Sequence, residues 1–170
     1  AISIGEVILR LQTLLPETPG GDPYIIECNI DTFVDNCIAN NIQGVSIELK
    51  RADVNSQLGY LYYDSAEPLT KVYDEKGYDE RYLFYLLQKL RSANIKTYAW
   101  WPTFNDAVMA QANPTAYAQH RRDFSNDNLE ASPNFVSPHS IAVRQHQQNM
   151  IHEILTHPSM QGWDGIRLDY

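Results

Sequence analysis

Short segments that alternate apolar and polar residues recur along the chain, and amphipathic helical patterns separate them. Three of these segments, 45–50, 95–101 and 162–169, predict strands, and a fourth strand is expected at 24–30. Helices are expected from about 31 to 40, 79 to 93 and 138 to 157. Strands that alternate with helices at this spacing form a parallel sheet covered by helices. The pattern therefore indicates an α/β fold, either an open doubly wound sheet or a barrel.

The N-terminal region predicts one further helix. Between residues 3 and 15, apolar residues recur every three or four positions, and Ser3 with Glu6 has the spacing of a capping box. Prolines and glycines follow between 16 and 23. We expect residues 1–23 to form a helix and linker, and residues 24–170 to form the main domain.

Charged residues near the ends of the predicted strands favour the barrel. These residues are Glu27, Glu48, Lys50, Arg167 and Asp169. Alternation along each strand places them on the face opposite its apolar side chains. An open sheet buried on both faces has nearly continuous apolar strands, whereas a barrel mouth gives such side chains a shared polar interior. No glycine-rich phosphate loop follows the first predicted strand, which argues against a dinucleotide fold.

Several short segments, in this order and spacing, resemble a glycoside hydrolase-like bacterial family with a (β/α)8 TIM-barrel fold. They are Gly44-Val45-Ser46-Ile47-Glu48-Leu49-Lys50, Leu61-Tyr62-Tyr63-Asp64-Ser65, 95–102, Asn113-Pro114, Phe135-Val136-Ser137-Pro138 and Asp164-Gly165-Ile166-Arg167-Leu168-Asp169-Tyr170. The resemblance covers about residues 24–170. It implies hydrolysis of a polysaccharide, and action in the periplasm, at the cell surface or after secretion.

The length of the chain allows about half of such a barrel. A complete (β/α)8 barrel takes about 250 residues, and this chain has 170. We expect the first four strands and three helices here, with the rest of the barrel supplied by the same longer chain or by a second chain. Half a barrel expressed alone would leave strand edges open and is expected to self-associate.

Asp169 is the strongest catalytic candidate, because glycoside hydrolysis uses carboxyl groups and barrel enzymes keep their chemistry at the C-terminal ends of strands. The alternative is an Asp that pairs with Arg167 or Lys50 to balance charge. Glu48 is a candidate second carboxylate, with positioning or charge balance as its alternative role.

Aromatic and charged neighbours are candidates for binding the substrate. If Tyr98 points inward, the two-residue period of a strand points Trp100 inward as well and Trp101 into the core. Trp100 would then offer a flat platform for a sugar ring. Lys50, Arg167 and Glu27 are expected on the same inner wall. Packing is the alternative for both tryptophans.

Composition limits the partners. With a formal net charge of -8 and 13 scattered Lys and Arg residues, the chain is a poor match for nucleic acid, and a neutral polar substrate fits better. No apolar run is long enough to span a membrane. The histidines lack metal-ligand spacing, so neither a catalytic metal nor another cofactor is expected. Cys28 and Cys37 are expected to be buried free thiols, with a disulfide as the alternative.

Two other functions remain open. Chitinase-type hydrolases also place an Asp-Gly turn before a strand with aspartates, as Asp164, Gly165 and Asp169 do here. However, Arg167 replaces one expected Asp, and the expected glutamate would follow Tyr170. A non-catalytic carbohydrate-binding or structural barrel protein would use the same aromatics and acidic surface.

Overall fold

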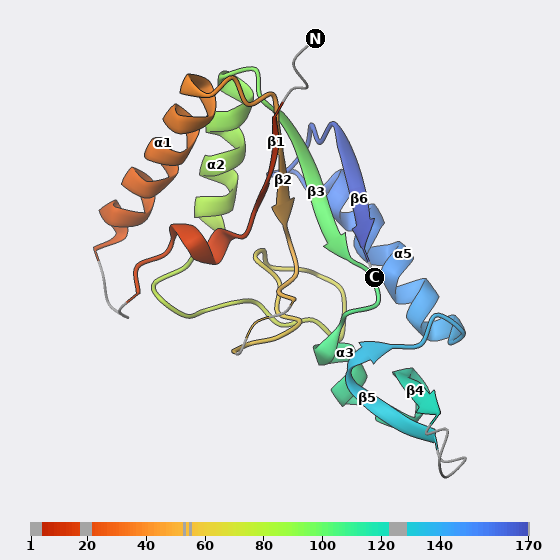
Figure 1. Cartoon of the computed structure of the whole chain (residues 1–170). Helices are drawn as coiled ribbons and strands as arrows, with labels where there is room; N and C mark the ends of the chain where they lie inside the picture. Colours follow the sequence, from red (N-terminus) through yellow and green to blue (C-terminus); the bar gives the residue numbers. More distant parts are fainter. Residues whose placement is uncertain (1–4, 18–21, 53, 55, 123–128, 170) are drawn as a thin grey trace.

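The computed structural model describes residues 5–17, 22–52, 54, 56–122 and 129–169. Four strands form a parallel sheet in the order β1-β2-β3-β6. They are β1 (Glu6–Leu9), β2 (Gly44–Glu48), β3 (Lys96–Pro102) and β6 (Gly165–Asp169). Three long helices connect them, α1 (Pro23–Ala39), α2 (Glu80–Ser92) and α5 (Ile141–Thr156). Figure 1 shows this arrangement.

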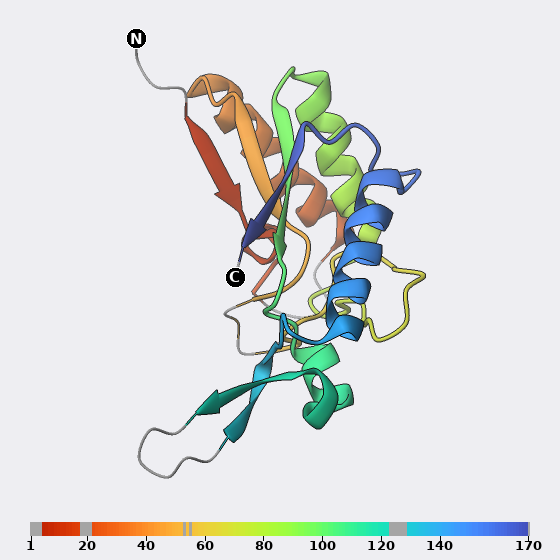
Figure 2. The same ribbon diagram turned by 90° about the vertical axis from the view of Figure 1, so that its right-hand side faces the viewer.

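The order of the strands identifies the sheet as part of a barrel. Each strand of the sheet lies beside the one that precedes it in the chain, so every crossover moves one position in the same direction. A doubly wound sheet reverses direction at a switch point, whereas a (β/α)8 barrel does not. The three long helices lie on one face of the sheet, and the described part of the chain leaves the opposite face open (Figure 2). The predicted α/β fold with a partial barrel is confirmed.

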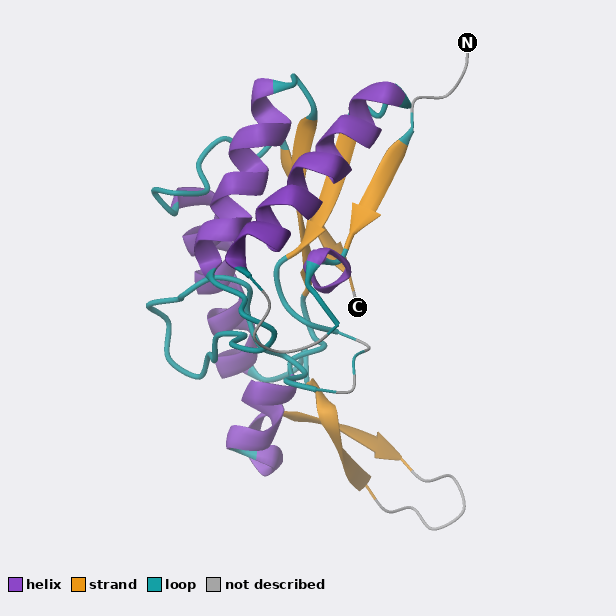
Figure 3. Cartoon of the chain, turned by 90° about the vertical axis from the view of Figure 1, so that its left-hand side faces the viewer, coloured by secondary structure: helices purple, strands orange, loops and turns teal. Residues whose placement is uncertain are grey.

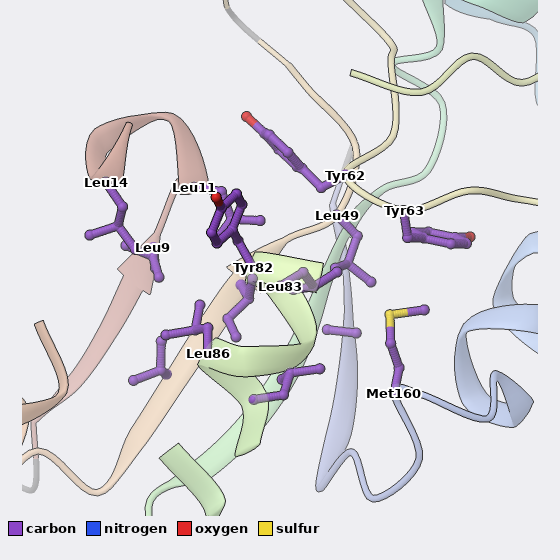
Figure 4. Packing of buried hydrophobic residues seen from close by; sticks show 14 of the residues in the cluster. Leu9, Leu11, Leu14, Leu49, Tyr62, Tyr63, Tyr82, Leu83, Leu86 and Met160 are labelled. Carbon is purple, nitrogen blue, oxygen red and sulfur yellow. The ribbon is translucent and has the colours of Figure 1, made fainter. Parts of the chain in front are cut away.

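The core lies between the sheet and these helices. Val45, Ile47 and Ala99 point from the strands into this layer and are inaccessible to solvent. Leucines of α2 meet them, with Leu83, Leu86 and Leu90 likewise inaccessible. Figure 4 shows part of this packing, including Leu83 and Leu86. Asp79 caps α2 by accepting a hydrogen bond from the Arg81 backbone N–H at 2.9 Å.

The predicted helix at 3–15 is wrong. The segment instead forms β1 and a short 3-10 helix, η1 (Leu11–Leu14). Leu9 is buried while Ile8 is 68% exposed, which is the two-residue period of a strand. In so short an apolar run, the two-residue period of a strand is easily confused with the three- to four-residue period of a helix. Pairing with β2 decides in favour of the strand. Residues 6–9 therefore belong to the same sheet as the later strands, and Ser3 lies outside the described residues.

The predicted strand at 24–30 is also wrong, because this segment begins α1. Asp22 caps the helix by accepting a hydrogen bond from the Tyr24 backbone N–H at 3.0 Å, and Pro23 occupies its first turn. The buried residues of α1 recur every three or four positions; they are Ile26, Ile30, Val34 and Cys37. The alternation of Tyr24, Ile26, Cys28 and Ile30 was therefore a coincidence, and Tyr24 is 67% exposed. Cys28 and Cys37 are both free, as expected.

Two long connections follow the C-terminal ends of β2 and β3. The first, before α2, folds inward and buries Tyr62, Tyr63, Tyr73 and Tyr78. The second contains α3 (Ala107–Ala112), α4 (Pro114–Tyr117) and an antiparallel hairpin of β4 (Ala118–Arg122) and β5 (Leu129–Val136). The sequence patterns did not predict these four elements. The hairpin extends away from the sheet (Figures 2 and 3). None of the described helices is long and apolar enough to cross a membrane.

Candidate active site

The open face of the sheet carries polar side chains in two layers. We use "open face" for the side opposite the long helices, which bears Glu6, Ile8, Arg10, Ser46, Glu48, Tyr98, Trp100, Arg167 and Asp169. Parallel pairing aligns Ile8 with Ser46, Ser46 with Tyr98, and Glu48 with Trp100. Side chains of alternate residues therefore form rows across the strands, as in the interior of barrel enzymes.

The lower layer joins the two outer strands. Arg167 of β6 donates a hydrogen bond to the Glu6 carboxylate of β1, and its guanidinium carbon lies 4.6 Å from the centre of the Tyr98 ring. Two strands separate β1 from β6, so a flat sheet would hold their backbones about 14 Å apart at roughly 4.8 Å per strand. Curvature toward the open face brings the two side chains together. Gly44 and Gly165 flank the Tyr98 ring, and a Cβ on either would lie 3.1–3.2 Å from it.

The upper layer contains the main candidate, Asp169. Its Oδ2 accepts a hydrogen bond from Trp100 Nε1 at 3.1 Å, which orients the carboxylate. Both side chains are half-buried and line a cavity of about 200 Å³, together with Ser46, Arg167 and residues of the outer strands. Asp169 is the last residue of β6, so this cavity lies at the C-terminal end of the sheet. The structure thus brings together three predicted site residues, Asp169, Trp100 and Arg167.

Glu48 lies in the same layer but is fully buried. Its Oε1 accepts a hydrogen bond from the Ala52 backbone N–H at 3.1 Å, and Oε2 lies 4.0 Å from Arg10 Nε. These contacts suit Glu48 better to positioning than to catalysis.

Lys50 does not lie on the open face, and this part of the sequence interpretation is wrong. The strand ends at Glu48, and the Lys50 side chain turns into the core, where it is 1% exposed. Its Nζ lies 3.2 Å from Asp106 Oδ2 and 4.3 Å from the centre of the Trp101 ring. Asp106 Oδ2 also accepts a hydrogen bond from Gln147 Nε2 at 3.1 Å. Burial lowers the pKa of Lys50, and the Asp106 charge opposes that shift.

Glu27 is also placed elsewhere. It lies on α1, on the helix layer, and its side chain is exposed. The expectation that it lines the inner wall followed from the wrong strand assignment at 24–30. Trp101 is fully buried against α5, where its Nε1 donates to Gln147 Oε1 at 3.0 Å, so its predicted place in the core is confirmed.

Sequence reasoning missed Arg10. Its guanidinium carbon lies 5.5 Å from the centre of the Trp100 ring, and a third of its side chain is exposed. Cation–π attraction across this distance helps to fix the indole. Had 6–9 been recognised as a strand, alternation from Glu6 and Ile8 would have placed Arg10 beside Glu48. Within the described residues, no group of three or more His, Cys, Asp or Glu side chains could hold a metal ion.

Solved structures with the same fold include glycoside hydrolases. The chain matches a hypothetical protein from Ruminiclostridium thermocellum ATCC 27405 with a TM-score of 0.66 and 17% identity, over 96% of this chain and 75% of that one. It matches the PgaB (BpsB) glycoside hydrolase domain from Bordetella bronchiseptica with a TM-score of 0.65 and 16% identity. The chain has a glycoside hydrolase-like fold. A third match is alpha-L-fucosidase isoenzyme 2 from Paenibacillus thiaminolyticus, with a TM-score of 0.65 and 14% identity.

The match covers nearly all of this chain but only part of most of these proteins. It extends over 95% of this chain and 42% of the Bordetella domain, and over 97% of this chain and 23% of the fucosidase. No protein-family model and no curated protein sequence matches the chain. The likeness therefore defines the fold, a parallel α/β unit corresponding to part of a (β/α)8 barrel.

Proposed function

We propose that the protein hydrolyses glycosidic bonds of a polysaccharide, with Asp169 as one of its two catalytic carboxylates. The observation that carries this proposal is the position of Asp169. It ends a barrel strand, faces a cavity and is oriented by an indole N–H. Barrel enzymes place catalytic groups at this end of the sheet. The fold shared with glycoside hydrolases supports the reaction class.

Trp100 supplies the proposed contact with a sugar ring. An indole offers a flat apolar face for the C–H groups of a pyranose, and Trp100 is held by Asp169 at its N–H and by Arg10 near its face. Arg167 lines the same cavity, and its guanidinium carbon lies 4.6 Å from the centre of the Tyr98 ring. In this arrangement the substrate would lie against Trp100 with its scissile bond near Asp169.

The second carboxylate of the pair is proposed to come from additional barrel strands, in the same longer chain or in a second chain. Glu6 is engaged with Arg167, and Glu48 is buried. Ile8 on β1 and Leu168 on β6 are 68% and 59% exposed at the two outer strands, where further strands would cover them.

The substitution Asp169→Asn in the full protein that carries this chain tests the proposal. Asn keeps the size of the side chain and an oxygen that can accept the Trp100 N–H, so the fold should be retained while hydrolysis falls by at least 10³-fold. Asp35→Asn on the exposed side of α1 is the matched control and should retain activity. Hydrolysis that persists in Asp169→Asn would exclude the proposed role.

One observation favours a second candidate function, a carbohydrate-binding protein without catalysis. On the described open face, Glu6 and Glu48 are both engaged near arginines, which leaves Asp169 without an obvious catalytic counterpart there. Binding of an oligosaccharide by wild type and Asp169→Asn alike, with no hydrolysis by either, would support this function.

A further inference from the structure

A second cavity lies at the same edge of the sheet as Asp169. Its volume is about 360 Å³, within the range of small-molecule sites. Its wall comes from η1, which follows β1, and from two parts of the connection between β2 and α2. The polar and aromatic residues of the wall are Gln12, Thr13, Arg51, Ser56, Tyr73 and Lys76.

Arg51 is a buried cation in this wall, with 4% of its surface exposed. Its Nε and Nη2 donate to the Ser56 carbonyl oxygen at 3.3 and 3.2 Å, and Nη1 donates to the Tyr62 hydroxyl at 2.8 Å. Its guanidinium carbon lies 4.1 Å from the centre of the Tyr73 ring. An arginine has five N–H donors, so these bonds leave two for a further acceptor.

Arg51 also lacks a counter-ion in the described part of the chain, where no carboxylate lies within ion-pair distance of it. A buried charge is costly without a partner, and stacking on Tyr73 offsets only part of that cost. An anionic ligand in the cavity would supply the missing charge.

Lys76 adds a second positive charge to the wall, and it too has no ion pair with a described residue. Two described acids that neighbour Lys76 in the sequence interact with other donors. Glu75 accepts a hydrogen bond from Ser56 Oγ at 3.0 Å, and Asp74 accepts one from the Gln57 amide. Neither carboxylate lines the cavity. Among the described lining residues the only charges are thus the two cations, which favours an anionic ligand in this cavity.

We propose that this cavity binds the carboxylate of an acidic sugar. Arg51 and Lys76 hold the carboxylate, and the Gln12 amide and Thr13 hydroxyl receive the hydroxyl groups of the ring. Binding of an oxyanion follows from the cavity alone, whereas its assignment to a sugar rests on the proposed function. The cavity is separate from the one beside Asp169, since the two share no lining residue.

Calorimetric titration of the full protein with glucuronate tests this proposal, with glucose and inorganic phosphate as comparisons. Glucuronate is expected to bind at least tenfold more tightly than either. Glucose binding as tightly would overturn the role of the charge, and phosphate binding as tightly would overturn the assignment to a sugar.

The substitution Lys76→Asn locates the site. Lys76 has a φ of 57°, a conformation that Asn tolerates well, so the variant should fold normally and bind glucuronate at least tenfold more weakly. Lys71→Asn is the matched control, because Lys71 is exposed in the same connection but does not line the cavity. Unchanged affinity in Lys76→Asn would refute the site. Asp169→Asn should leave this binding intact, so the outcome is independent of whether Asp169 is catalytic.

Discussion

The buried ion pair between Lys50 and Asp106 gives the sharpest test of the structure. Asp106→Asn removes the carboxylate charge. Its single amide oxygen can still accept the Gln147 hydrogen bond, while the cap that Oδ1 gives to the Met109 N–H is lost. Lys50 is then left charged at 1% exposure without its counter-ion. With an effective dielectric constant of about 20, Coulomb attraction at 3.2 Å is at most about 5 kcal/mol. Removal of one partner from a buried pair costs about 3–5 kcal/mol, so we expect this loss in the free energy of unfolding.

The same loss should depend on pH. Burial lowers the pKa of Lys50 in the folded state, and Asp106 opposes that shift, so Asp106→Asn lowers the folded pKa further. Between the folded pKa and the unfolded value of about 10.4, the unfolded chain binds more protons, and stability rises with pH. The deficit of Asp106→Asn should therefore be fully present below the folded pKa of Lys50 in the variant and shrink as pH rises through that pKa toward the unfolded value.

Urea denaturation of the full protein at several pH values measures both effects. Asp31→Asn is the matched control, because it breaks an exposed pair with Lys89 and should cost about 1 kcal/mol or less. Replacing Lys50 with Met in the Asp106→Asn background removes the stranded charge and should recover most of the stability. Equal losses in Asp106→Asn and Asp31→Asn, or no recovery in the double variant, would refute this reasoning.

Two further outcomes follow from the open face. Gly165→Ala should cost about 1–3 kcal/mol of stability in urea denaturation, because its Cβ would lie 3.2 Å from the Tyr98 ring; a cost below 0.5 kcal/mol would show that the ring yields freely. The chain of 170 residues expressed alone should self-associate in analytical ultracentrifugation through its outer strands. Replacing both Ile8 and Leu168 with Lys should reduce that association. If the unsubstituted chain is monomeric, the expectation is wrong.

The later strands and helices could be predicted because their local patterns are unambiguous. In β2, β3 and β6 polar residues alternate with apolar ones in the sequence, and the helix preceded by Asp79 has a long leucine stripe. The N-terminal assignments failed where two periods fit the same residues. At 24–30 the two-residue spacing competes with the stripe of Ile26 and Ile30, and only packing against the sheet decides between them.

The candidate site was predictable to the extent that alternation continues to the end of each strand. Trp100, Arg167 and Asp169 lie where a period of two places them. Lys50 departs from it because β2 ends at Glu48, and Asp106, on a connection 56 residues further along, draws the ammonium into the core. No local pattern reveals such a partner. The Glu6–Arg167 contact was equally hidden, since it depends on a curvature that only the assembled sheet has.

The two carboxylates of the upper layer have different surroundings, which suit them to different roles in the proposed function. Glu48 holds the connection after β2 through the Ala52 N–H and lies beside Arg10, which in turn faces the Trp100 ring. Its buried position gives a substrate no access. Asp169 is half-buried beside a cavity and accepts a hydrogen bond from the Nε1 of the same indole. Trp100 thus lies between a buried carboxylate and a carboxylate that lines a cavity, and for this reason the proposed function predicts that replacing Asp169, not Glu48, removes hydrolysis.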